Sequence, residues 1–303
     1  MSEFLTLQNI SKSFAEKEVV NIEHLTFKQS EIIGFLGPNG AGKTTTIRMI
    51  MQIIQPDQGE ILFNGHPLNE KDMAFIGYLP EERGLFKKNK VGDTIKFFGK
   101  LKGKSNSYIN KKMDEYLELF QLTDYKNKKI EELSRGMQQK LQFIITIIHD
   151  PQLIILDEPF TGLDPINVEI LLNIIKEERQ KGKTIIFSTH MMEKAEQICK
   201  NIILINKGKI LINENIKTLR DKFSTNEYEI ECDSSIEELE KLNFIKHIYK
   251  KNHKYIIVFD EKLDSKEALK KLIDATTNIK SFNLHRPSLY DIFLKVVEKG
   301  EQL

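Results

Sequence analysis

An eight-residue stretch near the N-terminus sets the architecture into which the rest of the chain must fit: Gly37-Pro38-Asn39-Gly40-Ala41-Gly42-Lys43-Thr44. The apolar run Ile32–Leu36 precedes it and indicates a buried strand, and Lys43–Ile53 is compatible with a helix. A glycine loop between a strand and a helix lets successive backbone N–H groups face an anion at the helix N-terminus. The stretch therefore predicts a phosphate site on an α/β core.

The side chains of this loop suggest the bound chemistry. Lys43 is placed to contact β and γ phosphates, and the Thr44 hydroxyl is placed to reach Mg²⁺. A loop of this composition also arises by chance, but a chance loop has no reason to stand between an apolar strand and a helix. The expected nucleotide contacts are Gly37, Pro38, Asn39, Gly40, Ala41, Gly42, Lys43, Thr44 and Thr45.

A second motif ends the buried run Leu153–Leu156 with two carboxylates, Asp157 and Glu158. Open α/β sheets bind ligands at the carboxyl ends of their strands, so we expect Asp157 to hold Mg²⁺ through water. Glu158 is expected beside the γ phosphate, where it accepts a proton from the attacking water or orients it. The alternative is an acidic N-cap before the next helix.

The order of the remaining elements predicts two domains. Residues 1–219 form the larger one, which opens with antiparallel strands, carries a helical insert at about 85–150 and continues as a parallel sheet flanked by helices. Asn206–Lys209 is a hairpin signal between two apolar runs. Residues 220–303 form a small α+β unit with strands Tyr228–Cys232 and Tyr255–Phe259. The other expected strands are Phe4–Leu7, Ile22–Phe27 and Thr184–Ser188, and the expected helices include Arg135–Ile148, Asn167–Gln180, Ser265–Ala275 and Leu289–Val297.

Composition limits the partners and the compartment. The 45 basic and 44 acidic residues leave a net charge of +1, so no global field favours nucleic acid, and none is expected as a partner. Cys199 and Cys232 lack metal or disulfide spacing, which suits a reducing cytoplasm. The apolar run Phe143–Ile148 is far shorter than the roughly 20 residues of a membrane span, and Met1–Phe14 does not resemble a signal peptide.

Further motifs resemble the ABC ATPase family, over about residues 1–215. Leu133-Ser134-Arg135-Gly136-Met137-Gln138-Gln139-Lys140 resembles its signature, Thr161–Pro165 its D-loop and Ser188–His190 its switch histidine. The resemblance implies an ATP-hydrolysing enzyme with a P-loop NTPase (RecA-like) α/β core, an antiparallel β subdomain, a helical insert and a small C-terminal α+β domain. It also implies that Glu158, His190 and Lys43 are catalytic and that the cofactors are ATP and Mg²⁺.

The signature implies a second subunit. Ser134 and Gly136 would supply a hydroxyl and a backbone N–H to the γ phosphate held by another chain, in a head-to-tail pair with two-fold symmetry. The pair is either a homodimer or a dimer with a related chain. Arg135 replaces the glycine more usual in the family, and it either adds a cation near the phosphate or packs on the surface.

Three other positions have a family role beside a plain structural alternative. His190 is expected at the γ phosphate rather than as a structural histidine, and Phe14 is expected to stack on adenine rather than to join the core. Glu81 stands where most family members carry the Q-loop glutamine. Its carboxylate is expected to face Mg²⁺, so the metal set is Thr44, Asp157 and Glu81, and the alternative is a solvated acidic turn.

Two short segments, Glu81–Leu85 and Arg286–Leu294, resemble a subgroup of bacterial exporter ATPases linked with sodium, drug or antibiotic efflux. The resemblance implies a transporter motor at the cytoplasmic face of the cell membrane, held there by membrane-spanning permease subunits on other chains. Leu85, Phe86, Phe97 and Phe98 are candidate contacts for those subunits, unless they belong to the core. The transported substance is not visible in the sequence.

The alternative function is a soluble ABC ATPase that acts on DNA or the ribosome. Relatives of that kind carry a long coiled coil or two ATPase units in one chain, and neither appears in this sequence. The basic stretch Lys246–Lys254 is better explained as a solvated face.

Overall fold

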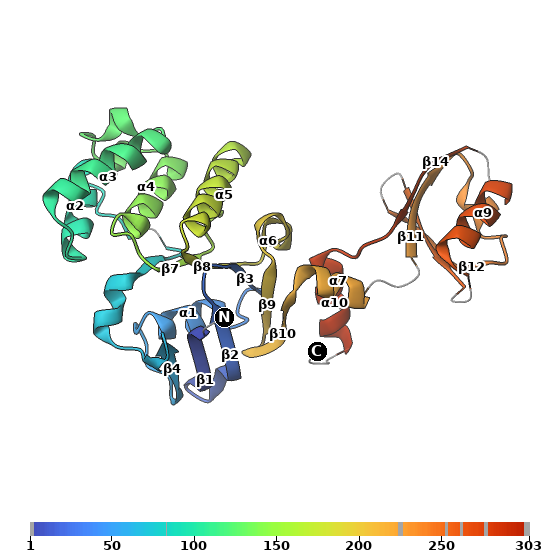
Figure 1. The fold of residues 1–303 in the computed structure, drawn as a ribbon, viewed down its shortest axis with the longest axis horizontal. Coiled ribbons are helices and arrows are strands. Elements are labelled where there is room, and N and C mark those ends of the chain that lie inside the picture. The colour runs from blue at the N-terminus through green and yellow to red at the C-terminus, as the bar shows by residue number, and fades with distance from the viewer. Residues whose placement is uncertain are drawn as a thin grey trace. The chain divides into compact units, whose positions relative to one another are not determined.

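The computed structural model describes residues 3–82, 84–223, 227–251, 254–260, 263–275 and 278–299 (Figure 1). The chain divides into two compact units. The first extends from the N-terminal strand to Ile216, and the second comprises Lys217–Lys295, with the end of the last helix, from Val296 onwards, counted with the first.

A six-stranded sheet forms the centre of the first unit, in the order β10-β9-β3-β8-β7-β6. All neighbours are parallel except β10, which pairs antiparallel with β9. Strands β3, β7 and β8 are buried along their whole length, as continuous apolar runs in a sheet covered on both faces are. The strands are β3 (Ile32–Leu36), β6 (Ile76–Leu79), β7 (Leu153–Asp157), β8 (Thr184–Thr189), β9 (Asn201–Asn206) and β10 (Lys209–Asn215).

A four-stranded antiparallel sheet, in the order β2-β1-β4-β5, shares its core with the central sheet. Helix α1 (Lys43–Ile50) contributes Ile47, Met49 and Ile50 to that common core. The first strand is longer than Phe4–Leu7, because its pairing with β2 continues to the tight turn at Ala15. The strands are β1 (Glu3–Phe14), β2 (Lys17–Lys28), β4 (Gln58–Phe63) and β5 (His66–Pro67).

Helices α2, α3 and α4 lie together as the expected helical insert, with α5 beside them (Figure 1). Ser105, Ser134 and Asp164 begin α3, α4 and α5 as N-caps, each accepting a hydrogen bond from a first-turn N–H. The helices are α2 (Val91–Leu101), α3 (Asn106–Leu119), α4 (Arg135–Ile147), α5 (Pro165–Gln180) and α6 (Met192–Ile198), with 3₁₀ turns at Glu70–Phe75, Thr123–Tyr125 and Ile130–Glu132.

The four residues considered as partner contacts are not core residues. Phe86 and Phe97 are 65% and 57% exposed, and Leu85 and Phe98 are partly buried. The rings of Phe97 and Phe98 meet edge to face, with centroids 5.3 Å apart. The interpretation that all four belong to the core is therefore wrong.

Two local predictions, one about a hairpin and one about the end of a helix, differ in outcome. The hairpin at Asn206–Lys209 is confirmed, because Lys207 and Gly208 both adopt positive φ, 48° and 79°, between β9 and β10. Helix α1, by contrast, ends at Ile50 rather than Ile53, since Gln52 turns into the left-handed region with φ 54°.

The second unit is built on a four-stranded antiparallel sheet in the order β12-β13-β11-β14. Tyr228, Ile230, Ile257 and Phe259 form its core with residues of α8 and α9. The sequence did not indicate β12 or β14, and the basic stretch read as a solvated face is mostly strand β12, with residues 252–253 outside the described part. The elements are α7 (Ile216–Phe223), β11 (Glu227–Cys232), α8 (Ile236–Leu239), β12 (Ile245–Lys251), β13 (Lys254–Phe259), α9 (Ser265–Ala275), β14 (Ile279–Leu284) and α10 (Leu289–Lys299).

Among the residues that the structure describes, no helix has both the length and the apolar character needed to cross a bilayer.

A buried histidine joins the helical insert to the central sheet. His149, 2% exposed, follows α4, and its Nε2 donates to the carbonyl oxygen of Ile76 in β6 at 3.2 Å. Lys102 at the end of α2 donates to the same oxygen at 3.2 Å. Burial, and next the positive charge of Lys102, lower the pKa of His149 from 6.5 to about 4.

We expect His149 to make the protein acid-sensitive. The unfolded chain takes up this proton near pH 6.5 and the folded chain only near pH 4, so the stabilisation is full above pH 6.5 and falls as the pH drops towards 4. The loss over this interval is about 3 kcal/mol. His149→Gln keeps a donor for Ile76 but does not titrate, so its free energy of unfolding should decrease less between neutral pH and pH 4. Equal decreases in both proteins would assign the acid sensitivity to other groups.

Candidate functional site

The glycine loop joins β3 to α1, and its backbone leaves no room for a side chain at Gly37 or Gly42. A Cβ on Gly37 would stand 2.3 Å from the carbonyl oxygen of Ile205, and one on Gly42 would stand 2.8 Å from that of Val19. Gly42 has φ 105° and is the N-cap of α1, where no side chain accepts a hydrogen bond from the first turn. The N–H groups of this helix end are thus open to an anion.

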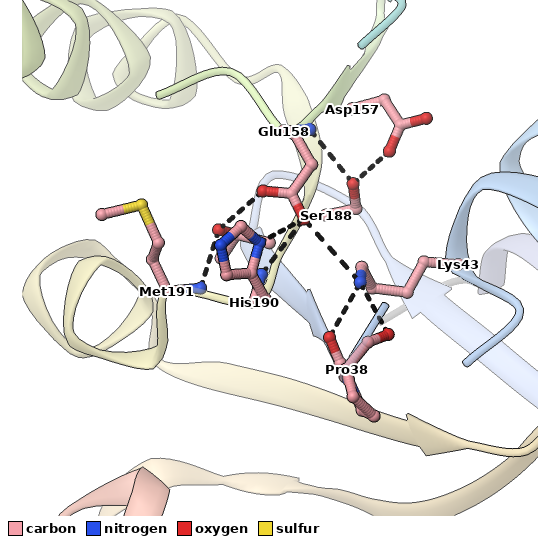
Figure 2. A network of polar contacts seen from close by, with 9 residues as sticks. Pro38, Lys43, Asp157, Glu158, Ser188, His190 and Met191 are labelled. Carbon is pink, nitrogen blue, oxygen red and sulfur yellow. Dashed lines mark hydrogen bonds and ion pairs between the residues drawn. The ribbon is translucent and has the colours of Figure 1, made fainter. Parts of the chain in front are cut away.

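Lys43, the first residue of α1, folds back onto the loop. Its Nζ donates to the carbonyl oxygens of Gly37 at 2.8 Å and Pro38 at 3.2 Å, and it lies 3.7 Å from a carboxylate oxygen of Glu158 (Figure 2). The side chain is only 6% exposed. Burial lowers the pKa of Lys43, whereas the charges of Glu158 and then Asp157 oppose that shift.

Asp157 ends β7 and is fully buried. Ser188, its register partner on β8, donates its hydroxyl to Oδ1 of Asp157 (Figure 2). Oδ2 has no hydrogen-bond partner within the described residues. Burial raises the pKa of Asp157, and the hydroxyls of Ser188 and Thr44 oppose the rise. An unpaired carboxylate oxygen near a threonine hydroxyl is the type of oxygen donor set that Mg²⁺ prefers, so these residues fit the ion.

Glu158, next along the chain, is held from the end of β8. Its Oε1 accepts from the backbone N–H of His190 at 3.2 Å and lies 3.0 Å from Nδ1 of the same residue (Figure 2). Its Oε2 accepts from the Thr189 hydroxyl at 3.2 Å. The backbone of Glu158 has φ 48°, a conformation uncommon for a residue with a side chain.

Most of the predicted site residues meet at one cleft of about 220 Å³. Glu81 belongs to this lining, and its side chain is exposed in a bend beside Glu82, which also fits the alternative of a solvated acidic turn. The predicted site residues that are not part of the lining are Phe14, Gly37, Pro38, Ser134, Gly136, His190 and the fully buried Asp157. The cleft is lined by Val19, Asn39, Gly40, Ala41, Gly42, Lys43, Thr44, Thr45, Glu81 and Glu158.

The similarity of this chain to a known protein extends over almost its full length. YhaQ of Bacillus subtilis (strain 168), an uncharacterized ABC transporter ATP-binding protein, is 38% identical over 293 residues, which cover 97% of this chain and 98% of YhaQ. This chain belongs to the ABC transporter ATP-binding proteins. Residues 20–161 match the family described as ABC transporter, and residues 215–297 match the family described as ATP-binding protein DrrA1-3-like, C-terminal domain.

Two further comparisons support the family and the fold of this ABC protein. The linearmycin resistance ATP-binding protein LnrL of Bacillus subtilis (strain 168) is 34% identical over 68% of this chain and 68% of its own length. A solved ATP-binding subunit of an ABC transporter superposes with a TM-score of 0.67 at 28% identity, covering 73% of this chain and 93% of that one. The family and the fold class predicted from the motifs are thus confirmed.

The signature residues of this ABC protein lie at the start of α4, away from the cleft. Ser134 caps the helix by accepting from the N–H of Met137 at 3.3 Å. A Cβ on Gly136 would meet nothing closer than 3.5 Å, so packing within the chain does not require a glycine there. Phe14 is 50% exposed, so it is not a core residue. Arg83, in the string that suggested the exporter subgroup, lies outside the described residues.

Sequence reasoning missed the side chains that hold the two carboxylates. It named Ser188 and Thr189 only as neighbours of the switch histidine, yet their hydroxyls donate to Asp157 and Glu158. The predicted parallel sheet could have indicated these contacts. Hydroxyl residues at the end of one buried parallel strand lie next to the carboxylates at the end of the neighbouring strand.

Proposed function

We propose that this ABC protein hydrolyses ATP as the motor subunit of a transporter. One observation supports this above all: the Glu158 carboxylate is fixed by Thr189 and His190 at the mouth of the phosphate loop, 3.7 Å from Lys43. A carboxylate held there is suited to accept a proton from the water that attacks the γ phosphate. Lys43 is suited to bind the phosphates themselves, and His190 to contact the γ phosphate.

The residues around Asp157 suit a magnesium ion that accompanies ATP. Thr44 and Asp157 would hold it, with the Glu81 carboxylate in the same cleft lining as Thr44. When bound, Mg²⁺ supplies neutralisation of the phosphate charge. Glu81 brings a negative charge to a place where a neutral glutamine is usual in the family. We assign it to the residues that face Mg²⁺, together with Thr44 and Asp157.

A second ATPase subunit, identical or related, would complete the site. Ser134 and Gly136 stand at the N-terminus of a 13-residue helix outside the cleft, and Gly136 is small without a packing reason in its own chain. A glycine that only an approaching partner requires supports contact with ATP bound to another subunit. In such a pair each chain contributes its phosphate loop to one ATP and its signature residues to the other. The dimer is therefore closed and has two-fold symmetry.

Membrane-spanning permease subunits are the proposed partners of the helical insert. Phe86 and Phe97, both more than half exposed, are large aromatic side chains of the kind enriched at protein interfaces. Attachment through them would place the chain at the cytoplasmic face of the membrane. The resistance named for LnrL supports export as the direction of transport, and ATP-driven closing and opening of the dimer would power it.

The deciding experiment is isolation of the protein from native membranes with the chains that accompany it. We expect a multi-spanning partner, and ATP turnover that changes when this partner is removed. Isolation with a soluble protein or nucleic acid instead, and turnover independent of any membrane chain, would contradict the transporter assignment and leave the ATPase chemistry standing.

Replacement of both exposed phenylalanines tests the docking site. We expect Phe86→Ser combined with Phe97→Ser to reduce recovery of the membrane partner at least about tenfold, because aromatic anchors carry most of the energy of an interface. Ile53→Ser is the matched control, since Ile53 is 58% exposed but lies after α1. Partner recovery that survives the double substitution, measured by co-purification, would remove this surface as the docking site.

A further inference from the structure

Phe14 lies beside a lysine that contacts its ring. It ends β1 with half of its side chain exposed. The ammonium group of Lys12 lies over its ring, 5.8 Å from the centroid, within the range of a cation–π contact. One face of the ring is therefore occupied by a cation, and a flat ligand has only the opposite face.

Lys12 is in turn fixed by Asp57, from the loop ahead of β4. Its Nζ donates to Oδ1 of Asp57 at 2.5 Å. The other oxygen of Asp57 accepts from the backbone N–H of Ser13 at 2.7 Å, and the N–H of Asp57 donates to the carbonyl oxygen of Ser11 at 2.8 Å. The hydrogen bonds from Lys12 and Ser13 hold the pKa of Asp57 below its ordinary value. One residue thus holds both the backbone and the cation that precede Phe14.

The backbone at this place is irregular. The pairing of β1 with β2 shifts register between Lys12 and Ser13, and its pairing with β4 shifts between Gln8 and Ser11. Such bulges change the direction in which the following side chains point. Asp57, 43 residues away in the sequence, makes its contacts with this irregular segment, directly before Phe14.

We propose that Lys12 and Asp57 form a clamp that positions Phe14 for stacking on the base of the nucleotide. The inference rests on the proposed function, in which the phosphates bind the glycine loop and the base reaches Phe14. Lys12 covers one face of the ring and Asp57 holds Lys12, so the base meets a ring that is already oriented. The clamp acts on the base alone, because none of its residues lines the cleft around the glycine loop.

A purely structural role makes a different prediction. The side chains of Lys12 and Asp57 are 17% and 42% exposed, and a pair so open to solvent contributes little to folding stability. Loss of this pair should therefore weaken binding of the nucleotide base and leave folding stability unchanged. The probes that separate these effects are ATP and inorganic tripolyphosphate, which shares the phosphates but lacks the base.

The test measures binding of both probes to the full chain by calorimetric titration in the presence of Mg²⁺. We expect Phe14→Ala to weaken ATP binding about tenfold, Asp57→Asn and Lys12→Met each about threefold, and none to change tripolyphosphate binding. Lys12→Arg, unlike Lys12→Met, should keep the ATP affinity of the unaltered protein, because arginine also pairs with a carboxylate and stacks on a ring. Asp114→Asn, which removes another surface pair, with Lys126, is the control and should change neither affinity.

The double variant isolates the clamp from the ring. In a Phe14→Ala background, Asp57→Asn should have no further effect on ATP binding. Equal loss of both probes in Asp57→Asn, or full additivity with Phe14→Ala, would overturn the clamp while the nucleotide site remains. Failure of the unaltered protein to bind either probe would overturn the proposed function, and the clamp with it.

Discussion

Glu158→Gln is expected to lower ATP turnover on the order of a thousandfold while ATP still binds. General base catalysis contributes about 10²–10⁴-fold, and an amide cannot take the proton of the attacking water. Glutamine has the same shape, and its oxygen can still accept from the N–H of His190, which now lies 3.2 Å from Oε1. The substitution also removes the negative charge beside Lys43, which favours retention of the phosphates.

Turnover, ATP affinity and molecular mass measured on the same preparation check this prediction. We expect the variant to accumulate as an ATP-bound dimer, which light scattering detects, and Gly136→Asp added to it should prevent that dimer. Glu193→Gln, an exposed carboxylate in the first turn of α6, is the control and should keep normal turnover. Normal turnover in Glu158→Gln would refute the assigned base.

The central site was predictable because its parts are local in the sequence. A buried strand, a glycine loop and a helix start follow one another from Ile32 to Lys43, and Asp157 and Glu158 directly follow another buried run. The contacts between these motifs were not local. Ser188 reaches Asp157, and Thr189 reaches Glu158, across 31 positions because β7 and β8 are neighbours in register, and spacing alone does not reveal strand order.

The second unit was harder to predict for a different reason. Its edge strands β12 and β14 carry Lys246, Lys250 and Lys280, and charged residues on edge strands weaken the alternating pattern by which strands are recognised. The irregular segment around Phe14 was also hidden, since Asp57 acts on it from a distant loop.

Lys43→Ala is expected to weaken ATP binding about a hundredfold, the range of lost charge-assisted hydrogen bonds to phosphate. The effect has two sources. The variant loses a donor to the phosphates, and it leaves Glu158, Asp157 and Glu81, whose charges all act on Lys43, without this cation beside an anionic ligand.

Lys102→Ala is the matched control for that substitution. Lys102 is also a partly buried lysine that donates to two backbone carbonyl oxygens, those of Met73 and Ile76, but it stands outside the cleft. Its loss should therefore reduce stability without changing ATP affinity, whereas Lys43→Ala should change affinity with a smaller effect on the melting temperature. Equal ATP affinity of Lys43→Ala and the unaltered protein would mean that the phosphates do not bind at this loop, because no nucleotide seated on the N-terminus of α1 could avoid the lysine that begins it.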